Sequence, residues 1–230
     1  MLEELKKEVC EANKMLQTYK LITFTWGNVS GIDREKGIFA IKPSGVPYEM
    51  LTPEDIVLMD LEGNVVEGKL KPSVDADTHL VIYRDFPNAG GVVHTHSPFA
   101  TAWAQAGRDI PCYGTTHADN YYGPIPCVRN LTDKELENYE YNTGVIISEE
   151  FKSRNIDPAA VTAVLCKNHG IFTWAKNAAK AVDNAVVLEE VAKMATYTEI
   201  INKDAEPTPQ GYQDKHYFRK HGPNATYGQK

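Results

Sequence analysis

The spacing of apolar residues and the helix-end signals along the chain predict five helices. Near the N-terminus, apolar side chains recur every three to four residues, which gathers them on one face of a helix. Thr132 and Glu135 form a capping-box pattern, and Gly107 is a typical residue to follow a helix end. Together these signals predict helices over residues 2–18, 77–83, 97–107, 132–155 and 177–202.

Short apolar and β-branched runs between these helices predict strands. Glu62-Gly63-Asn64 separates two such runs and is typical of a hairpin turn. Gly90-Gly91-Val92-Val93-His94-Thr95-His96-Ser97 begins as a buried strand. The other predicted strands cover residues 21–25, 38–41, 56–61, 65–67, 161–165 and 171–174. A chain of 230 residues with this density of elements fits one compact domain.

The C-terminal stretch from about residue 207 to residue 230 is polar, yet it contains four aromatic residues. A floppy tail usually lacks aromatic side chains, because nothing covers them. We therefore expect this stretch to dock, and a neighbouring subunit is the candidate partner. Its aromatic residues are Tyr212, Tyr217, Phe218 and Tyr227.

Composition narrows the possible partners. The formal net charge of −7 argues against nucleic acid or an anionic membrane as the main partner, although it leaves room for a small phosphorylated molecule. The four cysteines form no C-x-x-C pair, so we expect reduced thiols in the cytoplasm. The charged N-terminal run is unlike a signal peptide, and no run of about 18 apolar residues predicts a transmembrane helix.

The histidines suggest a metal site. His94 and His96 are two apart in a strand, so they point to one face about 6.6–6.8 Å apart along the chain. They can converge on one metal ion, or they can be hydrogen-bonded core residues. His169, before the flexible Gly170, and Asp75, before a helix, are candidates for the other ligands. Three imidazoles and one carboxylate suit Zn²⁺, with Mn²⁺ or Co²⁺ possible.

In this arrangement Asp75 has two possible roles. Four protein ligands describe a closed structural site, whereas a catalytic site needs an open or displaceable position. A carboxylate can move aside when a substrate binds, so Asp75 can be both ligand and gate. His79, inside a predicted helix, is interpreted as structural rather than as a ligand.

Two loops are candidates for binding an anion, although each can also be an ordinary turn. The first, Trp26-Gly27-Asn28, combines a flexible glycine with a side-chain amide. The second, Lys42-Pro43-Ser44-Gly45, combines a cation, a hydroxyl and an approachable backbone N–H. No P-loop, G-x-G-x-x-G, G-x-S-x-G or H-E-x-x-H motif is present, so nucleotide-binding and serine-hydrolase chemistry find no support.

Six segments together resemble the class II sugar-phosphate aldolase/epimerase family over essentially the whole chain. They are TWGNVS (25–30), KPSG (42–45), GGVVHTHS (90–97), GTTHAD (114–119), NHG (168–170) and the tail DKHYFRKHG with TYGQ. The resemblance implies a single α/β domain with a central, mainly antiparallel sheet flanked by helices. It also implies a homotetramer with active sites at subunit interfaces, to which the tail contributes. GTTHAD and the tail favour the epimerase branch.

The family's site residues fall on identifiable positions of this sequence. Its divalent-metal ligands, one Zn²⁺ per subunit, fall on Asp75, His94, His96 and His169. Its phosphate-binding residues fall on Gly27, Asn28, Lys42, Ser44, Gly45, Ser73 and Val74, the last replacing a serine of the epimerase pattern. Its proton-transfer pair falls on Asp119 and Tyr227, with Thr115, Glu140 and His216 in support.

For the epimerase branch, the resemblance implies inversion at C4 of L-ribulose 5-phosphate to D-xylulose 5-phosphate. The route is retro-aldol cleavage, rotation of the aldehyde and re-addition, with no NAD. The aldolase branch carries Glu as acid/base at the place of Asp75, and the shorter Asp argues against that role here. Three alternatives remain: an aldolase that releases the aldehyde, such as an L-fuculose-phosphate aldolase; a non-catalytic interaction module like the adducin head; and an unrelated zinc protein.

Overall fold

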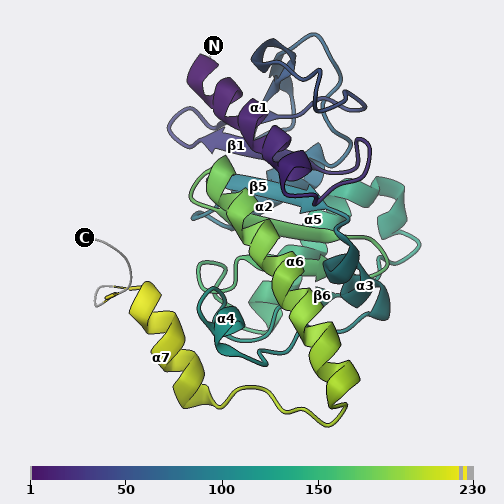
Figure 1. Ribbon diagram of the computed structural model, residues 1–230. Coiled ribbons are helices and arrows are strands. Elements are labelled where there is room, and N and C mark those ends of the chain that lie inside the picture. The colour runs from purple at the N-terminus through teal and green to yellow at the C-terminus, as the bar shows by residue number, and fades with distance from the viewer. Residues whose placement is uncertain (1, 223–224, 227–230) are drawn as a thin grey trace.

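A central eight-stranded sheet organises the protein. The structure is a computed structural model that describes residues 2–222, 225 and 226 (Figure 1). The strand order is β4-β3-β2-β1-β5-β8-β7-β6, and all neighbours are antiparallel except the parallel pair β6 and β7. The strands are β1 (Asn28–Asp33), β2 (Ile38–Ile41), β3 (Val57–Asp60), β4 (Val65–Glu67), β5 (Gly91–Thr95), β6 (Cys127–Val128), β7 (Ala163–Cys166) and β8 (Ile171–Ala175). This confirms the predicted α/β fold with a mainly antiparallel sheet.

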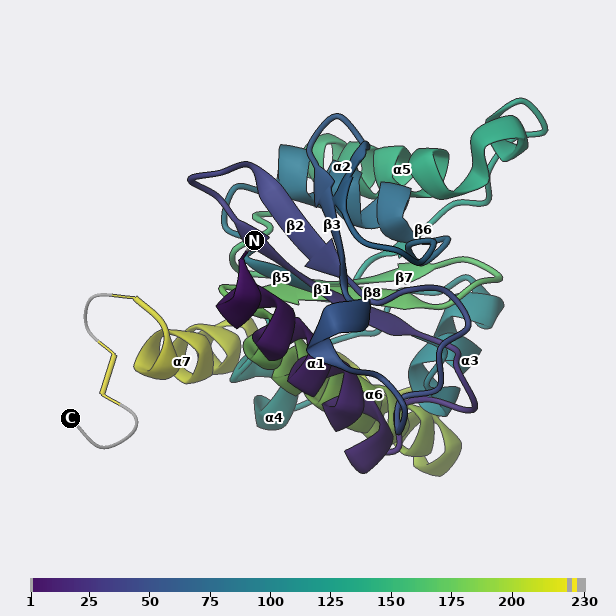
Figure 2. The same cartoon turned by 90° about the horizontal axis from the view of Figure 1, so that it is seen from above.

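Helices cover both faces of this sheet, as Figure 2 shows from above. On one face lie α2 (Ala76–Asp85) and α5 (Tyr139–Ser153). On the other lie α1 (Glu3–Thr18), α3 (Pro98–Ala106) and α6 (Ala178–Ile201). Successive side chains of a strand point to opposite faces, so β5 supplies both cores: Val92 packs towards α2 and α5, and Val93 towards α1 and α6.

Three short helical segments and one longer helix complete the described chain. These are η1 (Pro53–Asp55), α4 (Thr115–Ala118), η2 (Glu135–Asn138) and α7 (Gln210–Lys220). In the described ranges, no helix is both long enough and apolar enough to cross a membrane.

The predicted strand over residues 21–25 is wrong. This stretch forms a turn in which Trp26 N donates to Thr23 O over 3.0 Å, and Phe24 has a φ of 51°. A strand over residues 21–25 would need a neighbouring strand to pair with. Within the described chain β5 cannot be that neighbour, because it ends at Thr95 and pairs with β1 only from Asn28 onwards. Sheet pairing therefore overrides the local apolar pattern.

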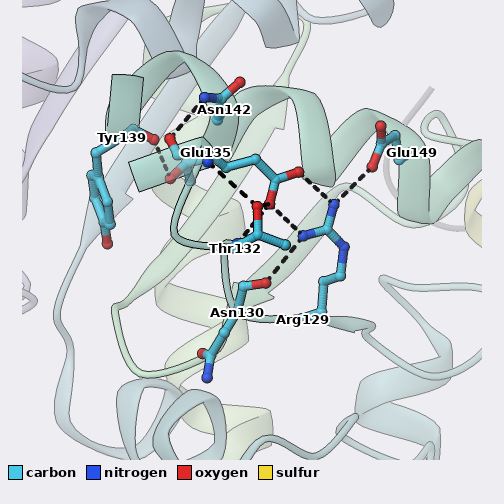
Figure 3. Close-up of polar contacts among 8 residues, drawn as sticks. Arg129, Asn130, Thr132, Glu135, Tyr139, Asn142 and Glu149 are labelled. Atoms are coloured by element: carbon cyan, nitrogen blue, oxygen red, sulfur yellow. Dashed lines mark hydrogen bonds and ion pairs between the residues drawn. The ribbon is translucent and has the colours of Figure 1, made fainter. Parts of the chain in front are cut away.

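The predicted helix over residues 132–155 is present with a tighter first turn. Figure 3 shows the capping box, in which the backbone N and Oγ1 of Thr132 donate to the carboxylate of Glu135 over 2.7 and 2.9 Å. Arg129 donates to the same carboxylate through two nitrogens at 2.8 Å each, and to Glu149 at 3.2 Å. These contacts fix η2, after which α5 begins at Tyr139.

The C-terminal stretch docks on its own chain as α7. The helix lies beside α4 at the end of an extended connection (Figure 1). The ring of Tyr122 lies 5.1 Å from that of Tyr217 and 5.4 Å from that of Phe218, centroid to centroid. These two aromatic residues of the stretch therefore have partners within the described chain.

Candidate active site

The structure brings His94, His96 and His169 together beside the sheet. One ring nitrogen from each lies within 4.8 Å of the others, and the two Nε2 atoms of His94 and His96 are 3.0 Å apart. His94 lies at the end of β5, His96 directly follows that strand, and His169 lies in the turn between β7 and β8. Residues far apart in the sequence thus meet because β5 and β8 are neighbours.

Two local features hold these rings in place. His94 stacks on Phe172 with ring centroids 4.4 Å apart, and its Nδ1 lies 2.9 Å from the carbonyl oxygen of Ile171. That carbonyl fixes the proton on Nδ1, so the lone pair of Nε2 faces the other histidines. Gly170 gives space rather than a bend: a Cβ there would lie 2.6 Å from Thr95 O, while Asn168 takes the left-handed conformation at φ 60°.

Asp75 completes the group from the start of α2. It occupies the N-cap position but makes no side-chain cap hydrogen bond with the described residues of that helix. Instead its Oδ2 accepts from Asn28 Nδ2 over 2.7 Å, and its Oδ1 lies 4.0 Å from His94 Nε2. Ser73 Oγ lies 3.3 Å from the same Oδ2. The carboxylate is therefore aimed at the histidines by two neighbouring polar side chains.

The electrostatics of the group favour a cation. Burial, followed by the neighbouring histidines, lowers the pKa of His96 to about 4 and that of His169 to about 3. For Asp75, burial raises the pKa, but the charges of His94 and His79 and the Asn28 hydrogen bond outweigh it, and the pKa is lowered. At neutral pH His96 and His169 therefore offer neutral imidazole nitrogens, and Asp75 offers an ionised carboxylate.

These residues fit a divalent metal ion such as zinc. Neutral imidazole and carboxylate are the states in which these side chains act as ligands, and three nitrogens with one oxygen suit a tetrahedral site. Within the described ranges, the buried Nδ1 of His169 has no hydrogen-bond partner, so no protein hydrogen bond fixes the tautomer of this ring. His79 behaves as expected for a structural residue: it is fully buried, and its Nδ1 lies 2.6 Å from Ser30 Oγ.

A cavity of about 540 Å³ adjoins this group, and every residue that was predicted to bind phosphate lines it. The loop Lys42-Pro43-Ser44-Gly45 lies beside residues 71–73 there, because Ser44 N donates to Lys71 O and Ser73 N donates to Lys42 O, each over 3.0 Å. Val74 is 66% exposed, so its side chain adds an apolar patch to the rim. The lining residues shared with the sequence prediction are Gly27, Asn28, Lys42, Ser44, Gly45, Ser73, Val74, Asp75, His94, His96 and His169.

Asp119, one of the two predicted proton-transfer residues, lies elsewhere. Asp119 follows α4, and its carboxylate contacts His216 Nδ1 at 3.1 Å, Arg219 Nη2 at 2.9 Å and Lys220 Nζ at 3.3 Å. Burial raises the pKa of Asp119, but the hydrogen bonds from Arg219, His216 and Lys220 together lower it by more, so the net shift of the pKa is downward. Asp119 is absent from the described lining of the metal cavity of its own chain.

The supporting residues of this set are also outside that described cavity lining. Thr115 begins α4, and its carbonyl accepts from Asp119 N over 2.8 Å. Glu140 lies in the first turn of α5, where its carbonyl accepts from Thr78 Oγ1 over 2.6 Å. Tyr227 lies outside the described residues.

Sequence reasoning missed two groups of residues near these sites. Arg219 and Lys220 follow His216 by three and four positions, so on a helix all three share one face. Treating the tail as a helix rather than as a docking segment would have found them. Tyr48, which is buried beneath Lys42, gave no signal beyond its place six residues after that lysine.

Comparisons with known proteins agree with this architecture. The sequence model of the class II aldolase and adducin N-terminal domain family matches residues 7–196. The structure is similar to that of an L-fuculose 1-phosphate aldolase, with a TM-score of 0.77 and 27% identity over 93% of this chain and 94% of that one.

Two more distant structures show the same fold. For the L-fuculose-1-phosphate aldolase from Thermus thermophilus, the TM-score is 0.66 and the identity 24%, over 89% of this chain and 98% of that one. For YgbL from Escherichia coli, whose activity is described only as aldolase, epimerase or decarboxylase, the TM-score is 0.70 and the identity 23%, over 93% and 97%.

Proposed function

The chain belongs to the class II aldolase and adducin N-terminal domain family, and on that premise we propose that it is a metal-dependent 4-epimerase of L-ribulose 5-phosphate. One observation carries the proposal: a single cavity combines three converging histidines and a carboxylate with the buried ammonium group of Lys42. Such a cavity suits a small molecule that is polar at one end and phosphorylated at the other.

Lys42 and the surrounding loops bind the phosphate in this proposal. Ser44 and Ser73 offer hydroxyl groups, and Gly45 has a φ of 70° and open space beside it, so its N–H can be approached closely. A buried cation together with several neutral donors is typical of a phosphate site. The phosphate anchors the aldehyde fragment while that fragment rotates.

His94, His96, His169 and Asp75 hold the metal ion, which we propose to be zinc. When bound, the metal supplies Lewis-acid stabilisation of the negative charge that develops as the C3–C4 bond breaks. In this proposal Asp75 is a metal ligand rather than the base, because Asn28 and Ser73 hold its carboxylate towards the histidines.

We assign the proton transfers to Asp119 and Tyr227, the pair that the resemblance implies. Inversion at C4 removes a proton from the hydroxyl on one face and returns one on the other, which one fixed group cannot easily do. Asp119 is absent from the described cavity lining of its own chain, so this proposal requires a second copy to supply it. A homotetramer with interfacial sites meets that requirement, and His216, Thr115 and Glu140 then support the transfer groups.

An aldolase that releases the aldehyde is the second candidate, because the structure with 27% identity is an L-fuculose 1-phosphate aldolase. Incubation of the zinc-loaded protein with L-ribulose 5-phosphate separates the two. We expect D-xylulose 5-phosphate to accumulate without free glycolaldehyde phosphate. Release of that aldehyde, or faster turnover of L-fuculose 1-phosphate, contradicts the epimerase.

A further inference from the structure

The ammonium group of Lys42 lies in an environment that ordinarily disfavours a charge. Lys42 is 2% exposed, and its Nζ donates to the carbonyl oxygen of Pro43 over 3.2 Å. Burial lowers its pKa to about 8, and no carboxylate of the described chain forms an ion pair with it. Buried charges are usually paired. The side chains packed around this ammonium group therefore decide how well its charged form is tolerated.

Tyr48 is the side chain that meets this ammonium group. It is 1% exposed, and Lys42 Nζ lies 4.8 Å from the centroid of its ring. A cation within about 6 Å of an aromatic face is attracted by the electron-rich face of the ring. Burial, and after it the charge of Asp75, raise the pKa of Tyr48, so it remains a neutral phenol that can donate a hydrogen bond.

The hydroxyl of Tyr48 reaches the second loop of the cavity. It donates to the carbonyl oxygen of Gly27 over 2.6 Å. Gly27 has a φ of 109°, and a Cβ there would lie 2.8 Å from His94 O, so its peptide is held between Tyr48 and β5. The next residue, Asn28, carries the amide that binds Asp75. One side chain thus touches both loops that line the cavity.

We infer that Tyr48 is a positioning residue for the phosphate end of the substrate: its ring keeps Lys42 charged without neutralising it, and its hydroxyl fixes the Gly27 turn. This inference rests on the proposed function, since it requires a phosphate in the cavity. A carboxylate in place of the ring would pair with Lys42 and compete with the incoming phosphate. A ring carries no net charge, so the positive charge of Lys42 stays available.

Two substitutions separate the two contacts. Tyr48→Phe keeps the ring and removes the hydroxyl, whereas Tyr48→Met removes both and conserves most of the volume. We expect inorganic phosphate to bind the zinc-loaded protein about threefold more weakly in Tyr48→Phe, measured by calorimetry. In Tyr48→Met we expect binding roughly tenfold weaker than in the wild type.

Tyr121→Phe is the matched control for a buried tyrosine. Tyr121 is fully buried, and its hydroxyl donates to the carbonyl oxygen of Asn184 over 2.8 Å, but it is not among the described residues that line the cavity. This variant should melt at a lower temperature than the wild type and bind phosphate as the wild type does. Weaker binding in the Tyr48 variants is then not a general effect of lost stability.

The pH dependence of binding gives a readout that a purely structural role would not move. Phosphate affinity of the wild type should fall as the pH rises through about 8, where Lys42 loses its proton. Without the ring, the ammonium form is less stable, so in Tyr48→Met the fall should begin roughly half a pH unit lower. In Tyr48→Phe the fall should begin where it does in the wild type.

The outcomes separate this inference from the proposed function. If the wild type does not bind phosphate, or Lys42→Met binds it equally well, the proposed function is wrong and the inference falls with it. If Lys42→Met loses phosphate while Tyr48→Met keeps both its affinity and its pH profile, the inference alone is wrong. Should Tyr48→Met fail to fold, unchanged affinity in Tyr48→Phe contradicts the role of the hydroxyl.

Discussion

The metal cavity and the Asp119 cluster are built in opposite ways. In the cavity, neutral His96 and His169 face an ionised Asp75, and Lys42 has no acidic partner among the described residues. The carboxylate and the ammonium group can therefore each bind a ligand of opposite charge. In the cluster, the carboxylate of Asp119 is already contacted by three cationic or titratable side chains of α7. The first region is organised for binding, whereas the second is satisfied without any ligand.

The difference follows from where each region lies in the fold. The cavity draws its residues from β1 and β5 and from the segments after β2, before α2 and between β7 and β8, most of which adjoin strands of the sheet. The cluster joins a four-residue helix to a helix at the end of an extended connection. A rigid sheet can hold metal-binding and phosphate-binding side chains in place before any ligand is bound. The position of two helices at the edge of the fold depends instead on what packs against them.

The largest effect should come from removing a histidine of the cavity. His94→Asn deletes the nitrogen that faces both His96 and Asp75, so we expect metal content to fall from about one ion per chain to near zero. Turnover should fall to below about one thousandth of the wild type. Elemental analysis and steady-state rates measure both quantities.

His117→Asn is the control for this loss. His117 is also buried, but its Nε2 lies 2.8 Å from the carbonyl oxygen of Gly123, outside the histidine group. It should keep the metal. Full activity after exhaustive treatment with a chelator would contradict the metal role of the whole region.

The next effect should come from the Asp119 cluster. Loss of a general acid or base typically lowers the rate by about 10² to 10⁴, and we expect Asp119→Asn to lie in that range. Because the cavity is separate, its metal content and phosphate affinity should stay unchanged. Asp214→Asn removes a carboxylate of α7 that accepts from Tyr122 Oη over 2.6 Å, and should keep kcat within about threefold.

Mixing two inactive variants tests whether the regions work in different chains. If the cavity of one chain meets Asp119 of another, co-refolded His94→Asn and Asp119→Asn chains form intact sites at about a quarter of positions by random pairing. Activity near that fraction supports an interfacial site. If each chain used its own Asp119, the mixture would stay as inactive as its components.

The cavity could be predicted from the sequence because its residues lie on short, local patterns. His94 and His96 are two apart on a strand, and Lys42, Ser44 and Gly45 belong to one loop. What the residues alone could not give was that these segments meet, since that depends on β1, β5 and β8 being neighbours. The resemblance to a family was what indicated that these separate segments form one site.

The cluster was less predictable because its determinants are tertiary. The aromatic residues indicated docking, but the partner is α4 of the same chain, and the helical form of α7 was not anticipated. The false strand over residues 21–25 has the same cause: its apolar pattern is local, whereas strand formation requires a neighbour. Local patterns thus predict elements, and contacts between elements decide which of them form.

Lys42 offers a smaller and more specific change within the cavity. Lys42→Met removes the buried cation, and we expect KM for the phosphorylated substrate to rise about 10- to 100-fold with metal content unchanged. In the wild type, KM should rise as the pH increases through about 8, because the ammonium loses its proton there. That rise should vanish in Lys42→Met. An unchanged KM would mean that the loops are ordinary turns.

The smallest expected effect concerns how Asp119 holds α7. Its pKa is lowered in the folded chain, so its contribution to docking is complete above the unfolded value of about 3.9 and is lost as the pH falls through the folded pKa. We expect amide protection in α7 to drop below a pH of about 4 while that of α6 stays constant. Asp119→Asn should remove this acid dependence and shift the melting temperature by no more than about 2 °C, as for other ion pairs near the surface. If α7 keeps its protection in acid, the rings of Tyr122 and Tyr217 hold the helix instead, and the cluster is as rigid as the cavity.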